Sequence, residues 1–291
     1  MTTFLRLLFS GLEWGSIFAL ATLGIVIIYR TSRATNFAQG AIGMFNAFAA
    51  TFLLLSFGLS PWIAALLAMI SAFLTGILID LLIIRRAEKV NILGKQIITF
   101  GIILVLLGVA PMLFGVVPLN FPRFIPTGAI TVGGASLTFN GLLFIVTGLA
   151  VMGGLFYFLQ YTKWGLAVRV TASNEQTARL MGVPTKLVTM GAWAVAAALG
   201  TLSALMVGQM VTVNVSMMEN VQVNALIAMV LGGFQTFHGP VIAAYLIALV
   251  GNFLRFYVSS TWAEVILYVL ILLFIVVRPN GLIGKKLVRK V

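Results

Sequence analysis

Long apolar segments alternate with short polar ones along the whole chain. Nine of them can be delimited, at about residues 4–29, 36–57, 61–84, 97–117, 141–161, 187–207, 223–237, 241–258 and 262–277. The runs are continuous, which is typical of helices that cross a bilayer and not of membrane strands. The segment at 223–237 is interrupted by Gly232 and Gly233 and is shorter than the roughly twenty residues that a crossing needs. The pattern predicts an all-α, polytopic membrane protein with eight or nine spans, one of them short or broken.

The composition narrows the class of protein further. The 291 residues are 61% hydrophobic and 8% charged, which excludes a soluble domain of this length. There is no cysteine, and one histidine and six acids leave little material for a metal centre. The sequence contains no P-loop, zinc-protease or serine-hydrolase motif, so we expect neither an enzyme nor a cofactor bound to this chain. We expect one membrane domain over 1–291, without a cleavable signal peptide.

The basic residues are concentrated in four of the segments that connect or follow the spans. The positive-inside rule makes these segments cytoplasmic, which places the N-terminus outside and, if 223–237 crosses, the C-terminus inside. Because the charge follows membrane topology, the net charge of +12 does not indicate nucleic acid binding. The residues concerned are Arg30 and Arg33; Arg85, Arg86, Lys89 and Lys95; Lys163, Arg169, Arg179 and Lys186; and Arg278, Lys285, Lys286, Arg289 and Lys290.

The segment 162–186 is unusually polar for this chain. Helical spacing relates four of its residues, Arg169, Ser173, Gln176 and Leu180. The spacing predicts a short helix over 170–181 that lies parallel to the membrane surface and ends at Gly182 and Pro184. A shaped polar segment between two spans suits contact with a partner protein. The alternative is an ordinary connecting loop held at the phospholipid headgroups.

Two apolar segments in opposite halves of the chain carry small and polar residues. A lipid-facing helix has no use for amide side chains, whereas short or glycine-interrupted segments in both halves are typical of a transport path. The alternative is that the amides and glycines join helices to one another. The candidate path residues are Asn36, Gln39, Gly40, Asn46, Gln222, Asn224, Gly232 and Gly233.

Two smaller features complete the pattern. β-like residues on both sides of Gly133-Gly134 predict a hairpin near 129–139, outside the membrane. Asp80 lies about one turn before Arg85, which favours an ion pair at the membrane interface.

Four motifs, in order along nearly the whole chain, resemble one family. They are Gly15–Gly24 followed by Asn36–Gly40, then Arg169–Val183, then Val230–Phe234 with Gly239, and finally Arg278–Gly284. The chain is similar to the membrane permease subunits of ABC importers for branched-chain amino acids, the LivH/LivM family, and closer to the LivH type. It departs from the family pattern at Ala41, Gln235, His238, Ala243 and Ala244, and these departures leave the substrate open.

The resemblance implies a multi-protein importer in the bacterial-type inner membrane, surrounded by membrane lipid. This chain would form half of the path for a branched-chain or other neutral amino acid, beside a second, similar permease. Two ATPase subunits would use ATP, and an extracytoplasmic solute-binding protein would deliver the solute. The residues implied in coupling to the ATPase are Arg169, Ala172, Asn174, Ala178, Arg179 and Gly182.

Two alternatives stay open. Relatives in the same family carry urea or short amides. A secondary transporter of amino acids would need a coupling-ion site built on acids, for which only Glu13 and Glu264 are candidates.

Overall fold

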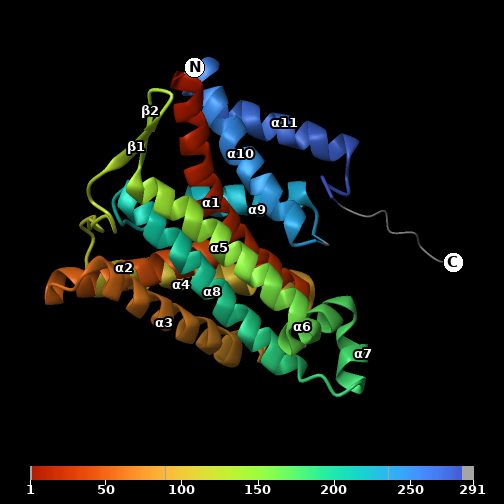
Figure 1. Cartoon of the computed structure of the whole chain (residues 1–291). Helices are drawn as coiled ribbons and strands as arrows, with labels where there is room; N and C mark the ends of the chain where they lie inside the picture. Colours follow the sequence, from red (N-terminus) through yellow and green to blue (C-terminus); the bar gives the residue numbers. More distant parts are fainter. Residues whose placement is uncertain (1, 89, 235, 284–291) are drawn as a thin grey trace.

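The computed structural model describes residues 2–88, 90–234 and 236–283, and almost all of its regular structure is helical (Figure 1). Lys89, Gln235 and the basic tail from Gly284 onward lie outside the described residues. Seven helices of the described part are long and apolar enough to cross a membrane. They are α1 (Thr2–Ser32), α2 (Gln39–Phe57), α3 (Pro61–Ile79, continued by the π-helical turn η1, Asp80–Ile84), α4 (Ile92–Phe114), α5 (Phe139–Tyr161), α8 (Thr185–Met210) and α10 (His238–Tyr257).

Helix α1 is the centre of the bundle, and its middle section is buried from Gly15 to Ile28. Glycines on α1 allow neighbouring helices to approach closely, because a side chain at Gly15 would collide with the ring of Tyr245 on α10. The hydroxyl of Ser203 on α8 donates to the carbonyl of Ile17 at 3.0 Å. Large apolar side chains stay exposed on α3, α4, α5 and α11 (Ala263–Val277), as expected of surfaces that contact lipid.

Helix α9 (Glu219–Gly232) contains most of the short apolar segment. It follows an irregular segment whose residue Val213 pairs with Leu119 in the connection before the hairpin. The hydroxyl of Thr22, part-way along α1, donates to the carbonyl of Ala225 at 3.4 Å. Beyond α9, the ring of Phe234 contacts that of Tyr29 at the end of α1. The short helix and the residues that follow it therefore pack along the second half of α1, and a membrane tolerates irregular backbone where it is buried in protein.

The predicted hairpin is confirmed. Strands β1 (Ala129–Val132) and β2 (Ala135–Thr138) pair antiparallel, with Val132 opposite Ala135. Both turn residues, Gly133 and Gly134, have positive φ, the requirement of a two-residue type I′ turn. The hairpin lies beside the first turns of α1 (Figure 1).

Three of the four basic segments meet at the opposite end of the molecule, as far as the structure describes them. Arg33 donates to the carbonyl of Ala172, and Arg85 donates to that of Lys186 at 3.4 Å. The amide of Leu282, after α11, donates to the carbonyl of Leu231 near the end of α9. This end is called the basic end below, and the end with the hairpin the hairpin end.

Candidate transport path and coupling segment

The start of α2 is a buried network of amides. Asn36 is fully buried and Gln39 is 1% exposed. The Gln39 amide donates to the carbonyl of Ala196 on α8 at 2.6 Å and accepts from the Asn36 amide at 3.2 Å. The Asn36 carbonyl oxygen accepts from the backbone amide of Ala38. These side chains fasten the non-helical stretch between α1 and α2 to α8.

Asn46 fastens α2 to α3. Its carbonyl oxygen accepts from the hydroxyls of Ser71 at 2.9 Å and Thr75 at 3.4 Å, and its NH₂ donates to the carbonyl of Ile42. Such bonds across helices are typical of buried polar residues in membrane proteins. Asn36, Gln39 and Asn46 therefore all have partners within the chain, the arrangement described by the helix-joining alternative.

Gly40 and Gln222 bring the two polar segments of the sequence together. The Gly40 amide donates to the Gln222 side-chain oxygen at 2.6 Å. Both residues line a cavity of about 230 Å³ between α2, α4 and α9, whose other lining residues are apolar except for Glu219. The NH₂ group of Gln222 is buried and has no hydrogen-bond partner among the described residues. Buried donors are nearly always bonded, so this one is a candidate contact for a solute or water.

Asn224 lies two residues further along α9 and faces a different cavity. This second cavity, of about 320 Å³, is lined by Trp14, Asn224 and the ion pair of Arg255 with Glu264. The Asn224 amide donates to the side chain of Asn220 at 2.8 Å. Gln222 and Asn224 therefore line two different cavities, because positions two apart on a helix point in nearly opposite directions. That either residue faces a path stays a prediction.

Gly232 and Gly233 line neither cavity. Gly232 packs so closely on the backbone of Gly239 and Pro240 that a side chain there has no room. Gly233 ends α9 with φ 95°. The two glycines thus make the tight turn from α9 into α10.

The polar segment 162–186 folds as two helices, not one. Helix α6 (Lys163–Ser173) and helix α7 (Glu175–Leu180) are separated by Asn174, whose extended backbone breaks the helix. The Asn174 side chain then accepts from the backbone amide of Thr177 at 3.1 Å and caps α7. The prediction of a single helix over 170–181 is wrong for this reason. The predicted stop is confirmed, since Gly182 follows α7 with φ 81°.

The candidate coupling residues hold this segment together. Ala172 and Ala178 are buried, and Arg169 donates to the carbonyls of Leu159 and Gln160 at 2.9 and 3.0 Å. Arg169 is therefore already engaged within the chain.

Arg179 links α7 to the turn between α3 and α4. It forms ion pairs with Glu88 at 2.5 Å and Glu175 at 2.7 Å. The Arg179 guanidinium, which donates to Glu88, lowers the pKa of that carboxyl below its ordinary value, and Lys186 and Lys95 add to the effect. Arg179, like Arg169, therefore already has partners within the chain.

Comparison with known proteins decides the family. The family model described as "Branched-chain amino acid transport system / permease component" matches residues 7–276. The chain belongs to this family of permeases. It is 26% identical to the high-affinity branched-chain amino acid transport system permease protein BraD of Pseudomonas aeruginosa, with 99% of this chain and 98% of that protein covered.

Two LivH proteins are similar over comparable lengths. The permease is 25% identical to LivH of Escherichia coli K12, over 99% of this chain and 98% of that one. It is 24% identical to the probable LivH of Methanocaldococcus jannaschii, over 95% and 92%. No solved structure was found to match. The resemblance to LivH-type permeases is thereby confirmed.

One exposed feature of the permease was not predicted from its sequence. Leu180 and Met181 close α7 with 89% and 61% of their surface exposed, beside buried Ala178. Both are apolar residues in a segment that lies outside the long apolar runs. Their signal was an apolar pair directly before Gly182, but helical spacing alone does not tell which face of α7 is covered.

Proposed function

We propose that this permease forms half of a translocation path for a branched-chain or other neutral amino acid, in an importer driven by separate ATPase subunits. The contact between Gly40 and Gln222 carries the proposal, because it places both interrupted segments at one cavity. The mostly apolar walls suit an aliphatic side chain, and the NH₂ group of Gln222, which has no partner among the described residues, can donate to a polar group of the solute. A cavity wall with few polar groups would bind the solute weakly, which suits a path that must release it.

A second, similar permease subunit would complete this cavity. The cavity opens on the outer face of α9, where Val223 is 43% exposed and Glu219 is also exposed. A carboxylate facing hydrocarbon is costly, so this face is better suited to water or another protein than to lipid. An extracytoplasmic solute-binding protein would load such a path from the hairpin end.

The orientation of the chain follows from the same arrangement. Three of the basic segments meet at one end, and the positive-inside rule favours the cytoplasm for that end. The N-terminus and the hairpin would then be outside, and Arg278 inside. The ATPase subunits would dock at the basic end, because this chain has no P-loop of its own.

The apolar tip of α7, Leu180 and Met181, is our proposed contact with the ATPase. The tip is exposed, yet it is fixed to the rest of the permease through Arg179, Glu88 and Glu175. Movement of the tip would therefore reach the turn between α3 and α4. A Leu180→Glu, Met181→Glu double variant should no longer co-purify with the ATPase, whereas Val90→Glu, which adds charge to another exposed apolar position near Glu88, should do so normally.

The path is tested by the uptake of labelled leucine into proteoliposomes that contain the complete importer and its binding protein. Gln222→Met keeps the length of the side chain and removes the amide, and we expect uptake per assembled complex to fall at least about fivefold, the effect of roughly 1 kcal/mol. The matched control is Gln96→Met on α4, away from the cavity. Normal uptake by Gln222→Met would refute the path. Uptake of urea or acetamide, but not leucine, by the unaltered importer would change the substrate class, and ATP-independent uptake would favour a secondary transporter.

A further inference from the structure

A large cavity at the basic end lies outside both the path and the tip of α7. It has a volume of about 660 Å³ and is bordered by the ends of α1 and α5, by α6, and by the turn from α9 into α10. Among its lining residues are Arg30 of α1, Arg169 of α6 and His238 of α10. The cavity thus joins four parts of the chain that are far apart in sequence.

Among the described residues, the lining of this cavity is basic and contains no acid. Both guanidinium groups, of Arg30 and Arg169, border it, and none of the described ion pairs includes either residue. The Arg30 guanidinium lies over the ring of Phe237, 4.4 Å from its centre, which holds the charge in place without neutralising it. Arg169 uses one of its terminal nitrogens on carbonyls. A positive cavity of this kind is suited to an anion.

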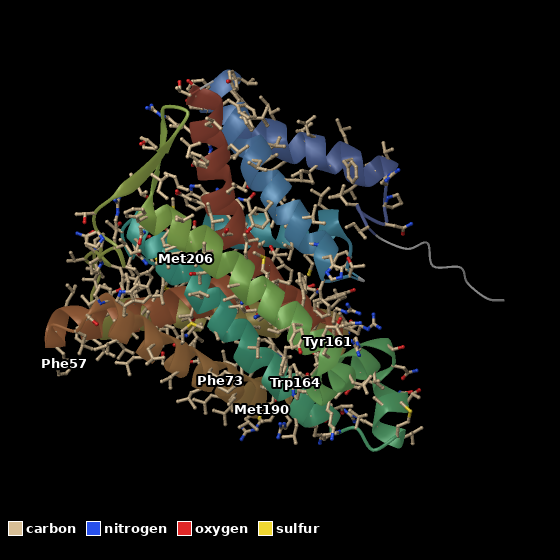
Figure 2. The ribbon with its side chains drawn as sticks, viewed as in Figure 1. Phe57, Phe73, Tyr161, Trp164, Met190 and Met206 are labelled. Carbon is tan, nitrogen blue, oxygen red and sulfur yellow. The ribbon has the colours of Figure 1, made fainter. Side chains whose placement is uncertain are left out.

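The rim of the cavity is aromatic and faces outward from the bundle. Tyr157 and Tyr161 are 67% and 73% exposed, with ring centres 4.9 Å apart. Figure 2 shows Tyr161 at the end of α5, close to Trp164 at the start of α6. Earlier on α5, Val146 and Leu149 are also more than half exposed. Apolar residues followed by tyrosines at a helix end are typical of the boundary between acyl chains and headgroups.

We propose that this cavity binds the phosphate headgroup of an anionic phospholipid. The two guanidinium groups would donate to the phosphate oxygens, and the exposed face of α5 would lie along the acyl chains. Basic pockets between membrane helices on the cytoplasmic side are suited to such headgroups. Only the choice of leaflet depends on the proposed orientation, and the binding itself is independent of the solute that the permease carries.

A bound headgroup would brace moving parts of the permease. It would contact α6 through Arg169 and the end of α1 through Arg30, and it would lie beside His238, the first residue of α10 after the turn from α9. These parts join the coupling segment to the helix that carries Gln222. We therefore expect anionic lipid to raise the rate of transport.

The direct test is lipid binding by the purified importer. Native mass spectrometry in phosphatidylcholine nanodiscs, titrated with phosphatidylglycerol, should show retained phosphatidylglycerol. Arg30→Gln should weaken this binding about five- to tenfold, since a basic residue near an anionic surface contributes about 1 kcal/mol. Arg30→Lys should restore most of it. Arg86→Gln, an exposed arginine at the same end that does not line the cavity, should have no effect.

Two further measurements keep the proposal open to refutation. If Arg30→Gln does not assemble, Tyr157→Ala with Tyr161→Ala removes only exposed side chains and should still lower lipid retention. Equal retention of phosphatidylglycerol by the unaltered protein and the variant would overturn the proposal. Displacement of the lipid by millimolar inorganic phosphate would also overturn it, because it would identify a soluble anion as the ligand.

Discussion

Two groups of buried amides lie close together in this permease and differ in their bonding. At the start of α2, Asn36, Gln39 and Asn46 have partners on α2, α3 and α8. Across the neighbouring cavity, Gln222 accepts one bond and its NH₂ group has no partner among the described residues. Both groups consist of Asn or Gln side chains, so residue type does not distinguish them. The hydrogen bonds do: amides with all their partners within the chain join helices, whereas an amide with a donor left over is a candidate contact for a solute.

The strongest test of the joining group is Gln39→Leu. The substitution leaves the carbonyl of Ala196 and the amide of Asn36 without their partner. Gly24 and Gly200 lie against the Gln39 side chain so closely that a side chain at either position would collide with it. Each unsatisfied buried group costs about 1–3 kcal/mol. We expect a loss of assembled permease, measured by size-exclusion chromatography and thermal unfolding in detergent. A variant as stable as the unaltered protein would show that this amide is not structural.

Asn46→Leu should have a smaller effect of the same kind. Hydrogen bonds between membrane helices contribute about 0.6 kcal/mol on average, and this substitution removes those to Ser71 and Thr75. We expect a fall of a few degrees in the unfolding temperature, with unchanged leucine uptake per assembled complex. A loss of uptake without a loss of stability would move Asn46 from the joining group to the path.

Gln222→Met should reverse this relation between stability and uptake. It removes the bond to the Gly40 amide, but it also removes an unsatisfied buried donor, so the two effects on stability largely offset each other. The free energy of unfolding should change by less than about 1 kcal/mol, while leucine uptake per assembled complex falls. Severe destabilisation would place Gln222 with the joining group instead.

The surface ion pairs of α7 should contribute least, and only above acidic pH. The carboxyl of Glu88 has a lowered pKa in the folded protein, so its pairing stabilises the fold above the ordinary Glu value of about 4.3 and is lost as the pH falls through the folded value. The hydrogen-exchange protection of α7, relative to the intrinsic exchange rate at each pH, should therefore fall below about pH 4. Glu88→Gln should remove this pH-dependent loss of protection, and an unchanged profile in that variant would assign it to another group.

The sequence predicted the elements of this fold better than their contacts. The long apolar runs predict the spans, and Gly133-Gly134 predicts the hairpin, because both signals are local. The break in the coupling segment depends on Asn174, whose side chain can cap a helix or lie within one. The partner of Gln39 lies 157 residues away, so no local pattern could tell which amides are satisfied. The exposed tip at Leu180 was missed for the same reason.

The central claim is that Gln222 faces the translocation path while Asn46 does not. The natural chain has no cysteine, so single Gln222→Cys and Asn46→Cys variants can be compared directly in the assembled importer. The decisive measurement is the rate of labelling by a small, membrane-impermeant thiol reagent, with and without leucine-loaded binding protein. The account predicts that Cys introduced in place of Gln222 is labelled and is protected when solute is supplied, while Cys in place of Asn46 is not labelled. Equal labelling of both, or labelling at position 46 alone, would contradict it.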